Sequence, residues 1–408
     1  MTEVIPETET QYAALIAGGQ GTRLFPMSHD LCPKQFCALD STQTFIQATV
    51  RRFANPEIGI RPSNVIVITT NPNQTALAKE QLLNLGVLSQ NIYEIDPHYG
   101  YAGAMVKAAE FIYELDNDAI IVNTPADQYI ISDEDFTGTI RGAFASARDG
   151  YPTLVGVKVT DLNTVMGCGH ALYDANESGL CKTVQGFVEK PCREKADKLM
   201  RKGNSACNTG INVWKASTLL EATEGFMQNH EAGLATDALM EEMMGKLRLA
   251  VGNFGWYDCG TLKSLYDISK KTPNHKNASL GLGKTFRHNC RGSLFYSIEQ
   301  VEIHAAGVED AAVVVNEVNG RMVVAIVNLA DSQRVRDLAE DFQQHKGFLT
   351  DDFSMGARNN RVSTTSVSEE IRVGFVGVRD YTVAAVKYND DGKFVIIVSN
   401  DSAHARVA

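Results

Sequence analysis

The chain has 408 residues, of which 44% are hydrophobic and 21% are charged, and its formal net charge at pH 7 is −11. This length allows two domains, or one large domain with an appendage, and the composition is ordinary for a globular protein. Because a phosphate backbone requires a basic face, the acidic balance argues against nucleic acid as a partner. Small anionic ligands are not excluded, since positive charge can be concentrated locally.

Apolar runs, the first residues and the cysteines indicate where in the cell the protein is expected. No run of 18 or more apolar residues occurs, so a membrane span is not expected, and no membrane is expected as a partner. The first twelve residues, MTEVIPETETQY, are acidic and polar, unlike a signal peptide. The eight cysteines include no CxxC pair, and Cys32 and Cys37 are the one closely spaced pair. We therefore expect neither a structural zinc site nor a disulfide framework, and a reduced cytoplasmic location fits best.

Apolar runs rich in β-formers alternate with helical patterns from residue 13 to about residue 160. The strands are expected at 65–70, 120–124 and 153–159, and the helices at 74–85 and 102–114. Gly86 closes the first of these helices. The alternation predicts an α/β fold, in which a mostly parallel sheet carries helices on both faces. Ligands of such sheets bind at the carboxyl ends of the strands.

The character of the chain changes after residue 270. KKTPNHKN is a polar linker with a proline, and short β-like runs and glycines follow it. Two segments of this part of the chain are similar in sequence: GVEDAAVVVNEVNGRMVVAIV (307–327) and GVRDYTVAAVKYNDDGKFVIIV (377–398). The two segments suggest a duplicated β unit, although two unrelated hairpins with similar turns would give the same pattern. An amphipathic helix is expected between them, at 331–345.

The stretch LIAGGQGTRLFPMSHDLCPKQF (15–36) begins like a phosphate-binding loop. A dinucleotide fingerprint would need a third glycine where Leu24 stands and a helix directly afterwards, which Pro26 and Pro33 would interrupt. A P-loop would need Gly-Lys-Ser/Thr, which is absent. What remains is a proline-stiffened loop whose glycine amides approach an anion, with Arg23 and Lys34 over it. A β-turn with surface charges is the other interpretation.

These residues also carry a family resemblance. GGQGTRLFPMS followed by CPKQF resembles the signature of nucleotidyltransferases that act on sugar 1-phosphates, and PKQF is most similar to bacterial-type mannose-1-phosphate guanylyltransferases. The similarity extends to about residue 340. It continues, in order, through TPADQYI (124–130), GCGH (167–170), GFVEKP (186–191), CNTGINVW (207–214) and FGWYDCGTLKSLYD (254–267).

The resemblance implies a fold and a domain organisation. The expected architecture is a Rossmann-like mixed, mostly parallel sheet flanked by helices, followed by a β-rich domain that is like a left-handed β-helix. Residues 1–272 would form the catalytic domain, 273–349 the β-helix-like domain, and 350–408 a β extension that partly repeats 307–327. A homo-oligomer, a dimer or a tetramer, is expected.

The resemblance also implies a reaction between an NTP and a sugar 1-phosphate. The sugar phosphate oxygen attacks the α-phosphorus in line and pyrophosphate leaves, so the protein mainly positions two anions and offsets their repulsion. Arg23 would hold the triphosphate and Lys34 would stabilise the developing pyrophosphate. The nucleotide-binding residues would be Leu15, Ala17, Gly18, Gly19, Gly21, Thr22 and Arg23. The sugar phosphate would be bound by Gly169, Glu189, Lys190 and Asn208.

Mg²⁺ is the cofactor that the resemblance implies, with Asp127 and Asp258 as its ligands. Mg²⁺ prefers hard oxygen ligands and accepts phosphate oxygens beside a few carboxylates. Asp127 follows the strand expected at 120–124, which places it at the ligand-binding edge of the sheet. Taken alone, such an aspartate is more often a turn or cap residue, and Asp258 is identified by resemblance only.

Several departures from the family pattern leave the substrates open. DPHYGYAGAM (96–105) stands where related guanylyltransferases carry Gly-Arg-Asn-Thr-Ala-Pro, Gln128 replaces a frequent histidine, and Cys168 and His170 replace aromatic residues. GTP and mannose 1-phosphate are favoured. The alternatives are the same reaction with another base or sugar, and a catalytically silent regulatory homologue that binds nucleotide sugar.

Overall fold

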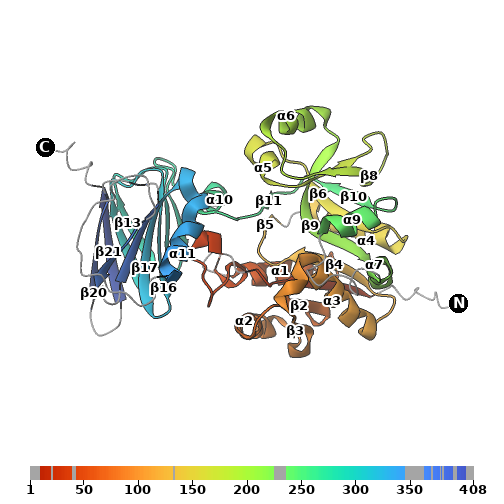
Figure 1. Cartoon of the computed structure of the whole chain (residues 1–408), viewed down its shortest axis with the longest axis horizontal. Coiled ribbons are helices and arrows are strands. Elements are labelled where there is room, and N and C mark those ends of the chain that lie inside the picture. Colours follow the sequence, from red (N-terminus) through yellow and green to blue (C-terminus); the bar gives the residue numbers. More distant parts are fainter. Residues whose placement is uncertain are drawn as a thin grey trace. The chain divides into compact units, whose positions relative to one another are not determined.

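The computed structural model describes residues 10–19, 22–38, 43–131, 134–224, 236–344, 363–368, 371–376, 378, 381–388 and 393–400. The chain divides into two compact units (Figure 1). The first unit comprises residues 1–18 and 46–256, and the second comprises 19–45 and 257–408. The glycine-rich loop therefore leaves the first unit after Gly18. The expected domain boundary at residue 272 stays a prediction.

The first unit is built on a nine-stranded sheet with the order β3-β2-β1-β4-β9-β6-β10-β8-β7. β1 pairs in parallel with β2 and with β4, whereas β9 is antiparallel to β4 and β6. The strands are β1 (Gln11–Ile16), β2 (Val65–Thr69), β3 (Ile92–Glu94), β4 (Ile120–Pro125), β6 (Thr153–Val157), β7 (His170–Tyr173), β8 (Cys181–Val188), β9 (Ser205–Lys215) and β10 (Arg248–Gly252). A short pair, β5 (Tyr129–Ile130) and β11 (Trp256–Tyr257), lies outside this sheet. The expected mixed sheet is confirmed. The expectation that it is mostly parallel is wrong, because β9 is antiparallel to β4, β6 and β7, and β8 is antiparallel to β7 and β10.

Helices cover both faces of this sheet because its strands are apolar on both sides. Along β4, Ile121 packs with α3 and α7, whereas Ile120 and Val122 point to the opposite face and are equally buried. The helices are α1 (Phe45–Phe53), α2 (Pro72–Leu82), α3 (Gly100–Leu115), α4 (Glu134–Arg148), α5 (Leu162–Gly167), α6 (Arg193–Lys202), α7 (Ala216–Thr223) and α9 (Thr236–Glu242). The α2 and α3 helices confirm the two helices expected from the sequence.

The beginning and end of α2 follow from local chemistry. The Asn71 side chain caps the helix by accepting a hydrogen bond from the Gln74 amide at 2.9 Å, and Pro72 occupies the first helical position. A short 3₁₀ turn, η4 (Leu83–Leu85), follows, and Gly86 then adopts a φ of 88°. This left-handed conformation is accessible to glycine at little cost, which explains why the segment ends there.

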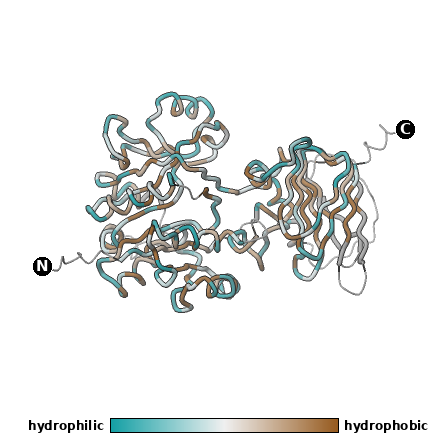
Figure 2. Tube along the Cα trace, turned by 180° about the vertical axis from the view of Figure 1, so that it is seen from behind, coloured by the Kyte–Doolittle hydropathy of each residue, from teal (hydrophilic) through white to brown (hydrophobic). Residues whose placement is uncertain are grey.

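The second unit contains two β-sheets that enclose an apolar core. The six-stranded sheet has the order β12-β14-β16-β17-β19-β18, and the four-stranded sheet has the order β13-β15-β21-β20. In Figure 2 hydrophobic positions follow these strands, and side chains from both sheets share one core cluster. The strands are β12 (Ala278–Gly281), β13 (Lys284–His288), β14 (Leu294–Ser297), β15 (Val301–Ala306), β16 (Ala311–Val318), β17 (Arg321–Asn328), β18 (Ser363–Ser368), β19 (Ile371–Val376), β20 (Tyr381–Tyr388) and β21 (Lys393–Asn400).

The strand directions in the second unit do not confirm a β-helix. Consecutive strands from β12 to β16 alternate between the two sheets and stack in parallel, as a β-helix requires. The later pairs β16–β17, β18–β19 and β20–β21 are antiparallel. The two similar sequence segments each contain one of these antiparallel pairs, β16–β17 and β20–β21. Residues 377, 379–380 and 389–392 of the second segment lie outside the described residues.

Helices and 3₁₀ turns complete the second unit. They are η1 (Thr22–Leu24), η2 (Lys34–Phe36), α10 (Leu262–Ile268), η7 (Leu329–Arg334) and α11 (Val335–Gln344). The last two correspond to the amphipathic helix expected at 331–345. Across the described residues, no helix has the length and apolar content that a membrane span requires.

One expectation from cysteine spacing was wrong, because Cys168 and Cys207 form a disulfide bond. The two residues are 39 positions apart in the sequence. The antiparallel pairing of β7 with β9 sets His170 opposite Cys207 and so brings Cys168 close. Sequence spacing alone contains no sign of this pairing.

Candidate active site

The first unit fixes the start of the glycine-rich loop with side chains that follow β2, one in the turn after it and one on α2. Leu15 and Ala17 are buried at the carboxyl end of β1. The Gly18 carbonyl accepts hydrogen bonds from Thr70 Oγ1 at 3.1 Å and from Gln74 Nε2 at 3.4 Å. A Cβ atom on Gly18 would lie 2.5 Å from Thr70 Cγ2, so this approach requires glycine. The loop therefore leaves β1 along a defined path.

Asp127 lies where the sequence predicts it, directly beyond the carboxyl end of β4. Tyr101, from the first turn of α3, donates a hydrogen bond to the Gly210 carbonyl at 2.9 Å. Burial, and to a smaller extent the nearby Asp127 carboxylate, raise the pKa of Tyr101 above its usual range. The hydroxyl therefore stays protonated, and Asp127 lies near the part of β9 that contains Gly210. Neither Tyr101 nor this contact was predicted from the sequence.

The backbone beyond Asp127 is hydrogen-bonded by a side chain of α1. Arg52 is buried and its Nη2 donates to the Gln128 carbonyl at 3.5 Å, while Nη1 donates to Thr49 Oγ1 at 3.4 Å. Burial lowers the pKa of Arg52 to about 10, with the Tyr129 hydroxyl opposing this shift. The Gln128 side chain in turn donates to the Thr209 carbonyl at 2.5 Å. The loop that carries Asp127 is thus held by α1 and by β9.

The four residues expected to bind sugar phosphate gather at one end of β7, β8 and β9. The Asn208 amide donates to the Gly169 carbonyl at 2.8 Å. A Cβ atom on Gly169 would collide with Glu189 Oε2, so that carboxylate lies directly over the glycine. Lys190 follows with a φ of 35°, and its Nζ lies 3.2 Å from Glu189 Oε1. More than half of each of these two side chains is exposed, which leaves them accessible to a ligand.

In the second unit the rest of the glycine-rich loop packs against the β domain. The buried Asn316, on β16, donates from Nδ2 to the carbonyls of Pro26 at 2.9 Å and of Met27 at 3.2 Å. The Phe25 ring packs against Phe342 of α11, with a centroid separation of 5.3 Å. These contacts hold the irregular segment without a long helix, as the prolines predict. Gly21 lies outside the described residues, and Thr22 begins η1.

Three of the predicted charged residues lie together in the second unit. The buried Lys34 donates from Nζ to the Asp258 carbonyl at 2.5 Å. A methyl group on Gly260 would lie 3.0 Å from Asp258 Oδ2 and 3.7 Å from Arg23 Nη1, so both side chains approach this glycine. Gln35 donates from Nε2 to the Gly19 carbonyl at 3.0 Å. The structure therefore groups Arg23, Lys34 and Asp258 around one turn.

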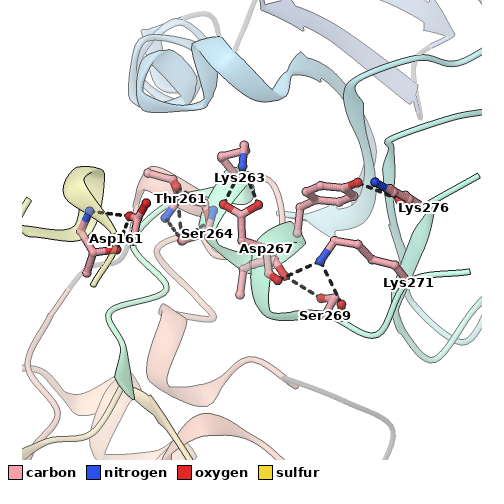
Figure 3. A network of polar contacts seen from close by, with 11 residues as sticks. Asp161, Thr261, Lys263, Ser264, Asp267, Ser269, Lys271 and Lys276 are labelled. Atoms are coloured by element: carbon pink, nitrogen blue, oxygen red, sulfur yellow. Dashed lines mark hydrogen bonds and ion pairs between the residues drawn. The ribbon is translucent and has the colours of Figure 1, made fainter. Parts of the chain in front are cut away.

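The turn after Asp258 is anchored by the start of α10. Thr261 and Ser264 form a reciprocal capping box (Figure 3), in which the Ser264 amide donates to Thr261 Oγ1 at 3.1 Å. Lys263 pairs with Asp267 one turn further on, and Lys271 donates to the Asp267 carbonyl at 2.8 Å. This network fixes the helix start, and thereby the backbone from which Asp258 projects.

The predicted residues are thus divided between the two units. Asp127 and the sugar-phosphate set belong to the first unit, whereas Gly19, Arg23, Lys34 and Asp258 belong to the second. The roles assigned to these residues, and the Mg²⁺ site of Asp127 and Asp258, stay predictions. Sequence reasoning missed Arg52, Thr70 and Tyr101. Their only local signal was their position in α1, after β2 and at the start of α3.

Comparison with known proteins identifies the family. The nucleotidyl transferase family model matches residues 12–275. A mannose-1-phosphate guanylyltransferase of Salmonella montevideo is 29% identical over 80% of this chain and 72% of its own length. Mannose-1-phosphate guanylyltransferase 2 of Escherichia coli O157:H7 is 28% identical over the same shares. A solved structure from Thermus thermophilus, described as a mannose-1-phosphate geranyltransferase, has a TM-score of 0.68. It is 24% identical and covers 82% of this chain and 99% of its own, which supports the fold.

The chain belongs to the nucleotidyl transferase family, because the family model covers more than half of its length. It is a sugar-1-phosphate nucleotidyltransferase, similar in sequence to mannose-1-phosphate guanylyltransferases. The resemblance inferred from the motifs is therefore confirmed.

Proposed function

We propose that this enzyme transfers a guanylyl group from GTP to mannose 1-phosphate, giving GDP-mannose and pyrophosphate. The observation that supports these substrates best is the match to relatives named mannose-1-phosphate guanylyltransferase over 80% of the chain. The PKQF segment, Lys34–Phe36 with its preceding proline, adds to it because it forms a turn that positions a buried lysine.

The second unit supplies the positive charge for the triphosphate in this proposal. An oxygen of the sugar phosphate attacks the α-phosphorus, and the bond to the leaving pyrophosphate breaks in line. Arg23 is exposed and can turn toward the triphosphate, while Lys34 is fixed by the Asp258 carbonyl. Positive charge that is positioned beforehand stabilises developing negative charge without reorganisation during the reaction. Lys34 therefore acts on the departing pyrophosphate.

The sugar phosphate is bound by the first unit. Glu189 accepts hydrogen bonds from sugar hydroxyls, and the Lys190 ammonium, 3.2 Å from that carboxylate, binds the phosphate. Asn208 and Gly169 fix the backbone on the other side through the 2.8 Å hydrogen bond between them. The positive φ of Lys190 turns the chain directly after β8, so that both exposed side chains lie near its end.

Asp127 and Asp258 would hold Mg²⁺. Their carboxylates suit it because they offer hard oxygen atoms, and Asp258 is exposed on a backbone fixed by Lys34. The ion would supply neutralisation of phosphate charge.

Incubation of the full chain with each NTP, a panel of sugar 1-phosphates and Mg²⁺ tests the proposal by release of pyrophosphate. GTP with mannose 1-phosphate should give the largest kcat/KM, and Lys34→Ala serves as the control that lacks the proposed phosphate ligand. A larger kcat/KM for another base or sugar would overturn the substrate assignment. Absence of pyrophosphate with every pair would overturn catalysis and favour a regulatory nucleotide-sugar binder.

A further inference from the structure

Two sulfur atoms and one imidazole meet inside the first unit at a place that nucleotidyl transfer does not require. Cys168 lies two residues before β7, His170 begins β7, and Cys207 lies opposite His170 on β9. All three residues are buried. The ligand atoms of these side chains, the two Sγ atoms and a ring nitrogen, all lie within 4.8 Å of one another. Three potential metal ligands therefore share one small volume.

The orientation of the imidazole is suited to a metal shared with the sulfur atoms. His170 Nε2 lies 3.5 Å from Cys168 Sγ and 3.9 Å from Cys207 Sγ. In a tetrahedral centre with Zn–S distances of about 2.3 Å and Zn–N of about 2.1 Å, nitrogen and sulfur would be about 3.6 Å apart. Both observed separations are close to this value. Nε2 is thus placed as one corner of such a centre.

The spacing of the two sulfur atoms depends on their oxidation state. They are bonded to each other in the structure, whereas two sulfur ligands of a tetrahedral zinc ion would be about 3.8 Å apart. Cys32 and Cys37 show the spacing that two unbonded thiols adopt in this protein, since their Sγ atoms are 3.8 Å apart. Reduction of the Cys168–Cys207 bond would therefore move its sulfur atoms toward the separation that a metal requires.

We propose that Cys168, His170 and Cys207 form a binding site for a thiophilic divalent cation of the Zn²⁺ type, which opens when the Cys168–Cys207 disulfide is reduced. A dithiol reductant supplies two electrons and two protons, becomes a disulfide itself, and leaves two thiols. The cation then displaces both thiol protons, so that two thiolates and one neutral imidazole balance its charge. Water occupies the fourth position of the tetrahedron.

The state of His170 is compatible with this exchange. Burial lowers the pKa of His170, against its hydrogen bond to Val165 and the charge of Glu189. Nε2 lies 2.8 Å from the Val165 carbonyl, and Nδ1 has no hydrogen-bond partner in the described part of the chain. When a metal binds at Nε2, the imidazole proton moves from Nε2 to Nδ1, and the hydrogen bond from Nε2 to the Val165 carbonyl is lost.

The site has a defined relation to the sugar-phosphate residues. Gly169 lies between Cys168 and His170, and Asn208 follows Cys207 directly. The hydrogen bond from the Asn208 amide to the Gly169 carbonyl thus joins the two segments that carry the ligands. The metal proposal does not depend on the proposed substrates, because binding can be measured without turnover.

The test titrates Co²⁺, as a spectroscopic substitute for Zn²⁺, into the full chain before and after reduction by a phosphine. The phosphine takes up the oxygen of one water molecule, and the two thiols receive its protons. The reduced protein should bind one Co²⁺ per chain with the absorption of tetrahedral cobalt thiolate, and Zn²⁺ should displace it. The oxidised protein should lack this absorption. Absence of the thiolate absorption after reduction would overturn the proposal.

Variants locate the metal. Cys168→Ser with Cys207→Ser should abolish the absorption, and His170→Gln, which keeps a donor for the Val165 carbonyl, should weaken Co²⁺ binding at least tenfold. The matched control is Cys32→Ser with Cys37→Ser, which removes the other close thiol pair and should leave the absorption unchanged. Absorption that disappears in the control and persists in the first double variant would overturn the assignment.

A measurement on the unaltered protein covers the case in which the variants do not fold. Zn²⁺ should protect Cys168 and Cys207 of the reduced protein from iodoacetamide by at least tenfold in rate, as followed by mass spectrometry of their peptides. The exposed Cys192 provides an internal reference, because its alkylation should not change. Equal alkylation of Cys168 and Cys207 with and without Zn²⁺ would refute the site.

Discussion

The contact between Gly18 and Thr70 offers a sharp test of how the glycine-rich loop is fixed. In Gly18→Ala the new methyl group would lie 2.5 Å from Thr70 Cγ2, whereas ordinary contacts are 3.4–4 Å. Either the loop moves by about 1 Å, or Thr70 rotates and gives up the hydrogen bond that its hydroxyl donates to the Gly18 carbonyl or to Gln74 Oε1. Overpacking of this kind costs about 1–3 kcal/mol, and each lost hydrogen bond about 1 kcal/mol.

We therefore expect Gly18→Ala to destabilise the first unit by about 2 kcal/mol. For a unit of this size, that corresponds to a decrease in Tm of about 4–8 °C in a thermal unfolding scan. Thr70→Ser removes the clashing methyl group and keeps the hydroxyl, so adding it to Gly18→Ala should recover more than half of the loss. Thr70→Ser alone is the control for the missing methyl group. A double variant no more stable than Gly18→Ala would refute the steric reasoning, as would a Gly18→Ala protein with unchanged Tm.

Three further predictions concern charged and titratable groups. Lys34→Ala should reduce kcat roughly a hundred- to a thousandfold, because it removes a donor to the negative charge that develops on the pyrophosphate. Lys190→Ala should chiefly raise the KM for sugar phosphate. If Lys190→Ala weakened only the affinity for NTP, the two lysines would have to exchange roles. Excess EDTA should abolish turnover, and full activity in EDTA would exclude the metal. Asp127→Asn and Asp258→Asn should each lose activity while circular dichroism shows that the protein remains folded. Burial lowers the pKa of His29, against the charge of Asp30. Below about pH 6.5 the unfolded chain therefore binds a proton that the folded protein does not bind. As a result, the free energy of unfolding falls as the pH falls. The Tm of His29→Gln should depend less on pH between about 5.5 and 7.5 than that of the unaltered protein, and an identical dependence would contradict this.

Local sequence was sufficient to predict several elements of the first unit. The strands expected at 65–70 and 120–124 correspond to β2 (Val65–Thr69) and β4 (Ile120–Pro125), because continuous apolar runs bounded by turn residues have few other stable arrangements. Proline spacing correctly predicted that no long helix follows the glycines, since η1 and η2 are single 3₁₀ turns. The order of the motifs identified the family.

The strand directions of the second unit could not be obtained in this way. An apolar run shows that a strand is buried but does not show which neighbour it joins or in which direction. The sequence resemblance predicted a β-helix-like domain at 273–349. There β12 to β16 stack in parallel as a β-helix requires, but β16 and β17 form an antiparallel hairpin, so the β-helix is not confirmed. Short turns joining strands of equal length favour this antiparallel pairing, because a parallel pair needs a long crossover connection.

The sequence by itself determined the family and several helices and strands of the first unit, and it predicts a set of charged residues for the proposed reaction. Only the tertiary structure decided which of these residues meet. Thr70 reaches the Gly18 carbonyl across 52 residues, Lys34 reaches Asp258 across 224, and Cys168 joins Cys207 across 39. Such contacts depend on sheet order and on loop paths, which arise from the packing of the whole chain. Hydrophobic periodicity and turn chemistry act over a few residues, and therefore leave these distant partners unspecified.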